Sequence, residues 1–430
     1  MDGAAVLLML ILALRVSRRG VIFIVLGAVL TVAQFATRPF ADALAAVLDG
    51  AQLAAFIAAF FTALATLRDV ADTSPAIGRC GRFLAQQPPG RRYGALTVGG
   101  QLFSLVLNYG AIALLGSLAM ASAREEQNAE IRRHRMRRML LAIQRGFISV
   151  LPWSPLSFAI AITTTLIPGA SWGAAVLPAL VTGALLAGIG YALDTLFKPK
   201  ITGPRPPRLA PDGTWASVLP LLALLGILMA LVGGIASVAD VRVAGIVIVV
   251  VPVLSLIWLV MQGEAGERWR ATKARIVRYT FEVMPSYRGE ITLLMMAGYI
   301  GTTGADLLVP VVVSAGVDLA TLPTALILVG FVWLIPVAGQ LGMNPILAVS
   351  LVAPLIPAAS VLGVSPTAIV VAITAGWALS GASSPFTATT LLVGSFASIS
   401  ATRVGLSWNG VYSLLCALAL SIWVVAYATL

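Results

Sequence analysis

Long runs of apolar residues, separated by short charged stretches, dominate the chain. Examples are Val21–Ala36, Gln52–Thr66, Val218–Val238 and Val243–Met261. A membrane-spanning helix needs about 20 mostly apolar residues, whereas the strands of a transmembrane barrel alternate apolar and polar residues. Because these runs are continuously apolar, they predict membrane-spanning α-helices. We expect Ala4–Leu14 to belong to a retained first helix, since its positive charges follow the apolar stretch, the reverse of a cleaved signal peptide.

The composition agrees with this pattern and sets the number of spans. Of 430 residues, 59% are hydrophobic and only 10% are charged, whereas soluble proteins have about 45–50% apolar and about 25% charged residues. This apolar content is enough for roughly ten to twelve spans. We therefore predict an all-α polytopic membrane protein and exclude a soluble enzyme, a nucleic-acid-binding domain and a disordered chain. The net charge of +11 is typical of lysine and arginine in cytoplasmic loops, which predicts a multi-pass protein of a bacterial-type inner (plasma) membrane.

Side chains that carry enzymatic or metal chemistry are scarce. The chain has two cysteines, Cys80 and Cys416, and one histidine, His134, which lies among arginines. These residues cannot form a disulfide framework, a zinc site or a Ser-His-Asp triad. The chain also lacks the phosphate-binding and zinc-protease motifs GxxxxGK[ST] and HExxH. We therefore expect a protein that is not an enzyme and that carries no metal and no cofactor.

The last third of the chain combines few charges with many helix-breaking residues. Ile291–Leu430 contains three formal charges, at Asp306, Asp318 and Arg403, and many glycines, prolines, serines and threonines. Irregular backbone at membrane depth is tolerated only where it is buried in protein or lines a cavity. Pro345–Leu362 and Pro366–Ser400 are therefore predicted to be broken helices or re-entrant hairpins.

A short internal repeat links the two halves of the chain. Ser154-Pro155-Leu156-Ser157 matches Ser384-Pro385-Phe386-Thr387 at an offset of 230, and Gly146 and Gly376 share this offset. A looser echo pairs Gly100-Gln101-Leu102 with Gly339-Gln340-Leu341, and Asn108 with Asn344. In secondary transporters, internal repeats bring discontinuous helices to one binding site at the membrane midplane. The alternative is that the hydroxyls bond to carbonyls of their own helix and the prolines only kink it.

With these motifs the chain resembles the ion-transporter superfamily of secondary carriers, which includes divalent-anion/sodium symporters and citrate-type permeases. Those proteins have two inverted repeats, each with a re-entrant hairpin that carries a Ser/Asn/Thr-type motif at its tip. Here proline, at Pro155 and Pro385, stands where asparagine is expected. The charged arm Arg124–Arg138 is similar to the surface helix that links the scaffold to the transport domain.

The resemblance implies a domain layout. An N-terminal repeat covers residues 1–197, with its hairpin at about 140–169, and a C-terminal repeat covers 216–430, with its hairpin at about 366–400. A linker at 198–215 joins them. The resemblance also implies a homodimer.

Together, the repeat and the resemblance predict a secondary active transporter. It would move a small organic or inorganic anion by alternating access of the elevator type, with Na⁺ or H⁺ as the coupling ion. The expected partners are this anion and the lipid bilayer, without nucleic acid. The predicted substrate-binding residues are the polar residues at the two tips and near them: Ser154, Pro155, Ser157, Thr163, Thr164, Asn344, Ser383, Ser384, Thr387, Thr389 and Thr390.

Two alternatives remain open at this point. Asp306 lies in an apolar segment, and a membrane carboxylate is usually functional, so a proton-linked exporter or antiporter could use it; a helix-end carboxylate is the structural alternative. A membrane-embedded lipid- or glycan-handling enzyme could bind lipid phosphates through Arg132–Arg138, although no catalytic set accompanies this arm. We expect Arg145 and Arg403 to extend to the membrane surface and weigh pairing with an anionic substrate as the alternative.

Overall fold

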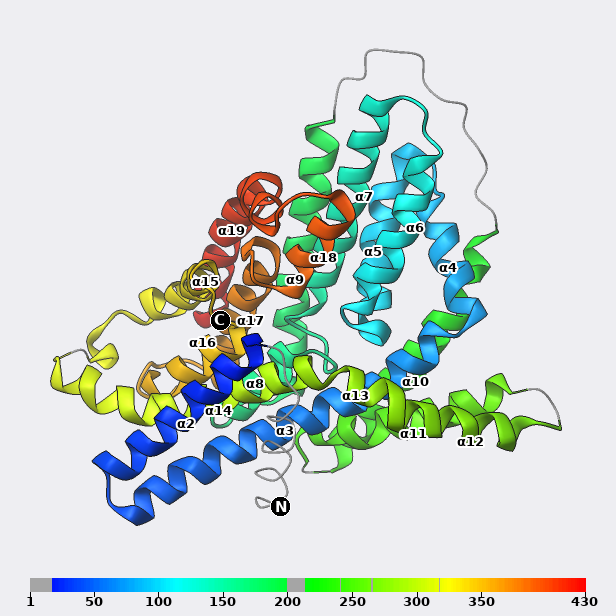
Figure 1. Cartoon of the computed structure of the whole chain (residues 1–430). Helices are drawn as coiled ribbons and strands as arrows, with labels where there is room; N and C mark the ends of the chain where they lie inside the picture. The colour runs from blue at the N-terminus through cyan, green and yellow to red at the C-terminus, as the bar shows by residue number, and fades with distance from the viewer. Residues whose placement is uncertain (1–17, 199–212, 240, 264–265, 317) are drawn as a thin grey trace.

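The computed structural model describes residues 18–198, 213–239, 241–263, 266–316 and 318–430. Within these ranges the chain forms helices and no strands (Figure 1), so the predicted all-α class is confirmed. The expected first helix, Ala4–Leu14, lies outside the described residues, and so does most of the 198–215 linker.

In chain order, the helices are α2 (Arg18–Thr37), α3 (Phe40–Asp72), α4 (Pro75–Ala85), α5 (Pro89–Leu107), α6 (Gly110–Arg124), α7 (Ala129–Val150), α8 (Phe158–Leu166), α9 (Trp172–Leu196), η1 (Trp215–Val218), α10 (Leu219–Val238), α11 (Val243–Gln262), α12 (Arg268–Arg278), η2 (Tyr279–Val283), α13 (Met284–Ser286), α14 (Arg288–Ser314), η3 (Leu319–Thr321), α15 (Thr324–Gln340), α16 (Pro345–Val352), η4 (Ala353–Leu355), α17 (Pro366–Ser383), α18 (Ala388–Ala397), η5 (Arg403–Trp408) and α19 (Gly410–Ala428).

Eight helical segments in the described ranges are long and apolar enough to cross a membrane, and three shorter apolar helices accompany them. Many of their large apolar side chains point outward. Leu177 on α9 and Ile422 on α19 are each 72% exposed, and Val249 on α11 is 65% exposed. So much outward apolar surface exceeds what a water-soluble monomer presents. The chain is therefore a multi-pass membrane protein.

A pair of long helices, α3 and α14, packs together along one side of the molecule (Figure 1). α3 has 33 residues and α14 has 27, more than the roughly 20 that a perpendicular span requires. Small residues allow the helices to approach closely: Gly50 faces Tyr299 and Thr303, and Gly298 faces Ile57. Close packing of small residues is a main source of helix association in lipid.

Two further helix pairs, α5 with α7 and α15 with α17, pack in the same way in the two halves. Gly146 on α7 lies against the backbone carbonyl of Thr97 on α5, and Gly376 on α17 lies against that of Phe331 on α15. A methyl group at either glycine would overlap the carbonyl oxygen. The repeated glycines therefore serve the same close contact between backbones.

The charged arm Arg124–Arg138 begins at the last residue of α6, and its part from Ala129 onward forms the first half of α7. Asn128 caps the N-terminus of α7 by accepting hydrogen bonds from the backbone amides of Glu130 and Ile131, and the helix continues without interruption to Val150. Arg138 donates two hydrogen bonds to Asp194 on α9, at 2.7 and 2.6 Å. The arm expected to be a separate surface helix is thus continuous with the helix that leads to the first repeat motif.

Candidate functional site

The first repeat motif interrupts the chain between α7 and α8. The Ser154 hydroxyl oxygen accepts a hydrogen bond from the Leu156 amide at 3.1 Å. Ser157 caps α8: its hydroxyl accepts from the Ile160 amide at 3.2 Å and donates to the Leu151 carbonyl at 2.7 Å. Pro155 is buried in the turn between them. The structure shows no hydrogen bond, within the described residues, that the Ser154 hydroxyl donates.

The second motif forms the same turn between α17 and α18. The Ser384 hydroxyl accepts from the Phe386 amide at 3.2 Å, as Ser154 does from Leu156, but it also donates to the Gly339 carbonyl at 2.6 Å. The hydroxyls of Thr387 and Thr390 both donate to the Ser384 carbonyl, at 3.0 and 2.6 Å. Thr389 donates to the Gly381 carbonyl. In this turn the hydroxyls therefore bond to nearby backbone.

The two interrupted helices touch each other near Gly381 of α17. A methyl group on Gly381 would lie 3.0 Å from the Ile148 side chain on α7 and 3.6 Å from that of Leu151. The Gln144 amide donates to the Gly381 carbonyl at 3.4 Å, alongside Thr389. These contacts pack α7 against α17, although 230 residues separate the motifs that follow the two helices.

A pocket lies at the first motif, and we call it the hairpin pocket. It is a partly open pocket in which the empty space, open solvent included, amounts to about 380 Å³. Its lining residues are Ser104, Asn108, Tyr109, Phe147, Val150, Leu151, Ser154, Leu156, Ser157, Phe158, Ala159 and Trp377. Trp377 comes from α17, so both halves contribute. The first residues of α8 lie in its wall, and a helix N-terminus carries partial positive charge and free amides. No carboxylate is among the described residues that line it.

The other predicted site residues lie outside this pocket. Thr164 and Ser383 donate to carbonyls of their own helices, Ile160 and Leu379, which is the structural alternative raised from the sequence. Asn344 caps α16 by accepting from the Ile346 amide at 2.9 Å. Thr163 is completely buried, and its hydroxyl has no hydrogen-bond partner in the described structure. Of the predicted set, Ser154 and Ser157 line the hairpin pocket.

Asp306 lies apart from the hairpin pocket. It is on α14, where Arg38 donates to its backbone carbonyl, and the charged groups around its carboxylate are Arg38 and Asp49. It lines neither the hairpin pocket nor the second pocket that adjoins it.

The expectation that Arg145 extends to the membrane surface is wrong. Its side chain is 5% exposed and donates to the Asn409 side chain and the Tyr93 hydroxyl, both at 3.1 Å. Its guanidinium lies 4.3 Å from the centre of the Tyr412 ring. Asn409 also donates to Gln144 at 2.9 Å, so this polar cluster joins α7 to the start of α19.

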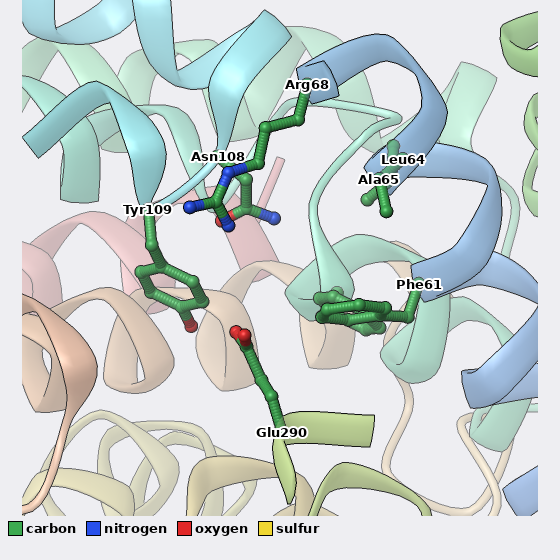
Figure 2. Close-up of a pocket in the computed structure, with 8 residues that line it drawn as sticks. Phe61, Leu64, Ala65, Arg68, Asn108, Tyr109 and Glu290 are labelled. Atoms are coloured by element: carbon green, nitrogen blue, oxygen red, sulfur yellow. The ribbon is translucent and has the colours of Figure 1, made fainter. Parts of the chain in front are cut away.

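A second pocket shares lining residues with the hairpin pocket. Figure 2 shows this second pocket, which we call the Arg68–Glu290 chamber. It is a half-open pocket in which the empty space, open solvent included, amounts to about 300 Å³. Its lining residues are Phe61, Leu64, Ala65, Arg68, Asn108, Tyr109, Phe158 and Glu290. The two pockets share Asn108, Tyr109 and Phe158. Sequence patterns assign no role to Arg68 or Glu290, because each lies near a helix end among other charges. Asn108 stands out in the sequence only through the weaker repeat, and its positive φ of 49° is visible only in the structure.

Comparison with solved structures shows which known fold this chain shares. No protein-family model matches the chain, and no curated protein matches its sequence. The YdaH transporter of Alcanivorax borkumensis, described as having an unusual topology, aligns with a TM-score of 0.59 and 16% identity over 95% of this chain and 98% of its own. MtrF of Neisseria gonorrhoeae, described with a class of antimetabolite efflux pumps, aligns with a TM-score of 0.61 and 15% identity over 97% of this chain and 96% of its own. The chain therefore has a fold found in membrane transporters, and the resemblance to the ion-transporter superfamily stays a prediction from the sequence.

Proposed function

We propose that the protein is a secondary active transporter that moves a small organic or inorganic anion across the inner membrane. The hairpin pocket would hold the anion, and the two interrupted helices would carry it by an alternating-access, elevator-type movement. Coupling to Na⁺ or H⁺ and a homodimeric state belong to the same proposal. The shared fold with two solved transporters supports the transporter class, and the description of MtrF favours export as the direction to test first.

The observation that carries the proposal is the unused hydrogen-bond donor of Ser154. Its hydroxyl lines the hairpin pocket but donates to no described residue. The side-chain amide of Asn108 lines the same pocket and also donates to none. These donors lie beside the N-terminus of α8, whose capping residue is Ser157. Hydroxyl and amide donors at a helix N-terminus suit an oxyanion, and the pocket wall offers no carboxylate to repel it.

The two serines of the repeat provide a matched test. Ser154→Ala removes a free donor from the pocket, whereas Ser384→Ala changes the same turn at a place where the hydroxyl already bonds to Gly339. We expect Ser154→Ala to weaken anion affinity by about 1–3 kcal/mol, or roughly five- to a hundred-fold. Ser384→Ala should lower thermal stability and leave affinity near the wild-type value.

The measurement is uptake of radiolabelled carboxylates and sulfate into proteoliposomes, with equal protein in each preparation and an outward or inward gradient of Na⁺ or H⁺. Thermal shift in detergent identifies which anion to label, because a ligand at 100 times its dissociation constant stabilises by about 2.7 kcal/mol. Equal affinity in wild type and Ser154→Ala would remove this serine from the site. Absence of any anion flux would overturn the proposed function.

A further inference from the structure

The Arg68–Glu290 chamber contains polar groups that form no hydrogen bond with any described residue. Figure 2 shows the side chains of Arg68, Asn108, Tyr109 and Glu290, which all line the chamber, with the Glu290 carboxylate directed toward the Tyr109 hydroxyl. Among the described residues, the side chains of Asn108, Tyr109 and Glu290 have no hydrogen-bond partner, and Glu290 forms no ion pair.

Arg68 also forms only weak interactions with its neighbours. Its Nε atom is buried and makes no hydrogen bond. Its ion pair with Asp72 has a distance of 3.8 Å, and the Asp72 side chain is 47% exposed, so solvent weakens this pair. The guanidinium lies 5.4 Å from the centre of the Tyr287 ring. A buried donor left without a partner costs free energy, which a ligand in the chamber would recover.

The remaining walls of the chamber are apolar. Phe61, Leu64 and Ala65 come from α3, and Phe158 comes from α8. Phe61 and Phe158 have ring centres 6.4 Å apart. An apolar pocket with a few convergent polar groups is the usual form of a small-molecule site. Arg68 supplies a positive group and Glu290 a negative one, so the ligand that complements the chamber carries both charges on an apolar body.

We propose that the Arg68–Glu290 chamber is a subsite for a zwitterionic solute with an aromatic or aliphatic body. Arg68 and Asn108 bind its oxyanion, and Glu290 binds its protonated amine. The proposal rests on the proposed transport function, because the chamber shares Asn108, Tyr109 and Phe158 with the hairpin pocket and would deliver the solute to it. It specifies the substrate of the proposed transporter as a solute whose oxyanion is accompanied by a protonated amine.

Three probes with the same phenyl body separate the two charges. Phenylalanine carries both groups, 3-phenylpropionate only the carboxylate, and phenethylamine only the ammonium. Equilibrium binding of labelled phenylalanine to the purified full chain in detergent, with the other two as competitors, gives their dissociation constants. We expect phenylalanine to bind about tenfold or more tightly than either single-charge probe, since charge-assisted hydrogen bonds add at each end.

Two variants test which residue binds the carboxylate and which binds the ammonium group of the probes. Arg68→Gln should weaken phenylalanine and 3-phenylpropionate about tenfold or more and leave phenethylamine nearly unchanged. Glu290→Gln should weaken phenylalanine and phenethylamine by a similar factor and leave 3-phenylpropionate nearly unchanged. Arg124→Gln and Glu130→Gln, both at exposed positions on α6 and α7, are the matched controls and should change none of the three.

Other results would overturn the proposal. If Arg68 and Glu290 only attract each other, both variants lower thermal stability, and neither variant changes the dissociation constant of one probe more than that of another. Failure to bind any of the three probes also excludes the chamber as a subsite. Anion flux that depends on Ser154, without charge-dependent binding in the chamber, would overturn only this subsite. Charge-dependent binding without any flux would overturn transport and leave the chamber as a binding site.

Discussion

The turns at Ser154 and Ser384 have the same sequence pattern and the same local hydrogen bond, but different surroundings. In each, the serine hydroxyl accepts from the amide two residues ahead. Around Ser384, the hydroxyl donates to Gly339, and neighbouring threonines donate to backbone carbonyls. Around Ser154, the hydroxyl donates to nothing described and lies in a pocket wall. A repeated motif therefore specifies a backbone turn, and the residues around each copy decide whether its polar groups remain available for a ligand.

The contact that the two halves share most closely is the glycine contact behind each turn. Gly146→Ala and Gly376→Ala each force a methyl group into a carbonyl oxygen of the facing helix. We expect each to lower the free energy of unfolding by about 3 kcal/mol, the upper part of the usual range for overpacking. Thermal melting of the purified protein in detergent checks this, with Gly330→Ala on α15 as the control because no atom lies within 4 Å of a methyl group there. A large loss at one glycine only would break the equivalence of the halves.

Replacements at the fourth residues of the two motifs, Ser157 and Thr387, should lower stability by unequal amounts. Ser157→Ala removes the cap of α8 and leaves the Leu151 carbonyl without its partner, which should cost about 2 kcal/mol of stability. Thr387→Val should cost about 0.5–1 kcal/mol, since Thr390 still donates to the Ser384 carbonyl. Thr387→Val should also leave anion affinity in proteoliposomes unchanged, because Thr387 is not among the residues that line the hairpin pocket. A loss of affinity in Thr387→Val would make the second turn part of the site, as the sequence predicted.

Replacement of Thr163 tests whether its hydroxyl binds a ligand or has only a structural role. Its hydroxyl is buried without a partner, so Thr163→Val, which keeps the shape, should raise the free energy of unfolding by about 1 kcal/mol. Melting temperatures give the sign directly. A fall in transport at unchanged or higher stability would instead show that Thr163 meets a substrate or ion during the transport cycle.

The smallest effects are expected where the hydroxyls bond to their own helix. Thr164→Val in the first half and Ser383→Ala in the second each remove one such bond. Each should change stability by about 0.5 kcal/mol and leave half-saturation and rate unchanged. An altered half-saturation in either variant would contradict the assignment of these two residues to structure.

Sequence patterns predicted the all-α membrane class well because burial in lipid requires long apolar helices with satisfied backbones. The offset of 230 between the motifs also pointed to two breaks with the same turn. The identity of the pocket-lining residues was predicted less well. Ser and Thr at a break bond either to backbone or to a ligand, and the choice depends on neighbours such as Gly339, which come from another helix.

The surroundings of charged residues were also difficult to predict from the sequence. Arg145 has the sequence context of an arginine near a membrane surface, yet Asn409 and Tyr93, from distant parts of the chain, surround it. Arg68 and Glu290 lie more than 200 residues apart and meet only because α3 packs against α14. The proximity of residues so far apart in the sequence depends on tertiary packing, which local periodicity does not encode.

The unbroken course of α7 has a mechanical consequence. One helix of 22 residues, about 33 Å long at 1.5 Å per residue, connects the basic arm at one end with the Ser154 turn at the other. A rod of this kind transmits tilt and translation along its whole length. Any displacement of the turn during transport must therefore appear at the arm, where a spectroscopic label at the half-buried Met136 would report it without touching the pocket.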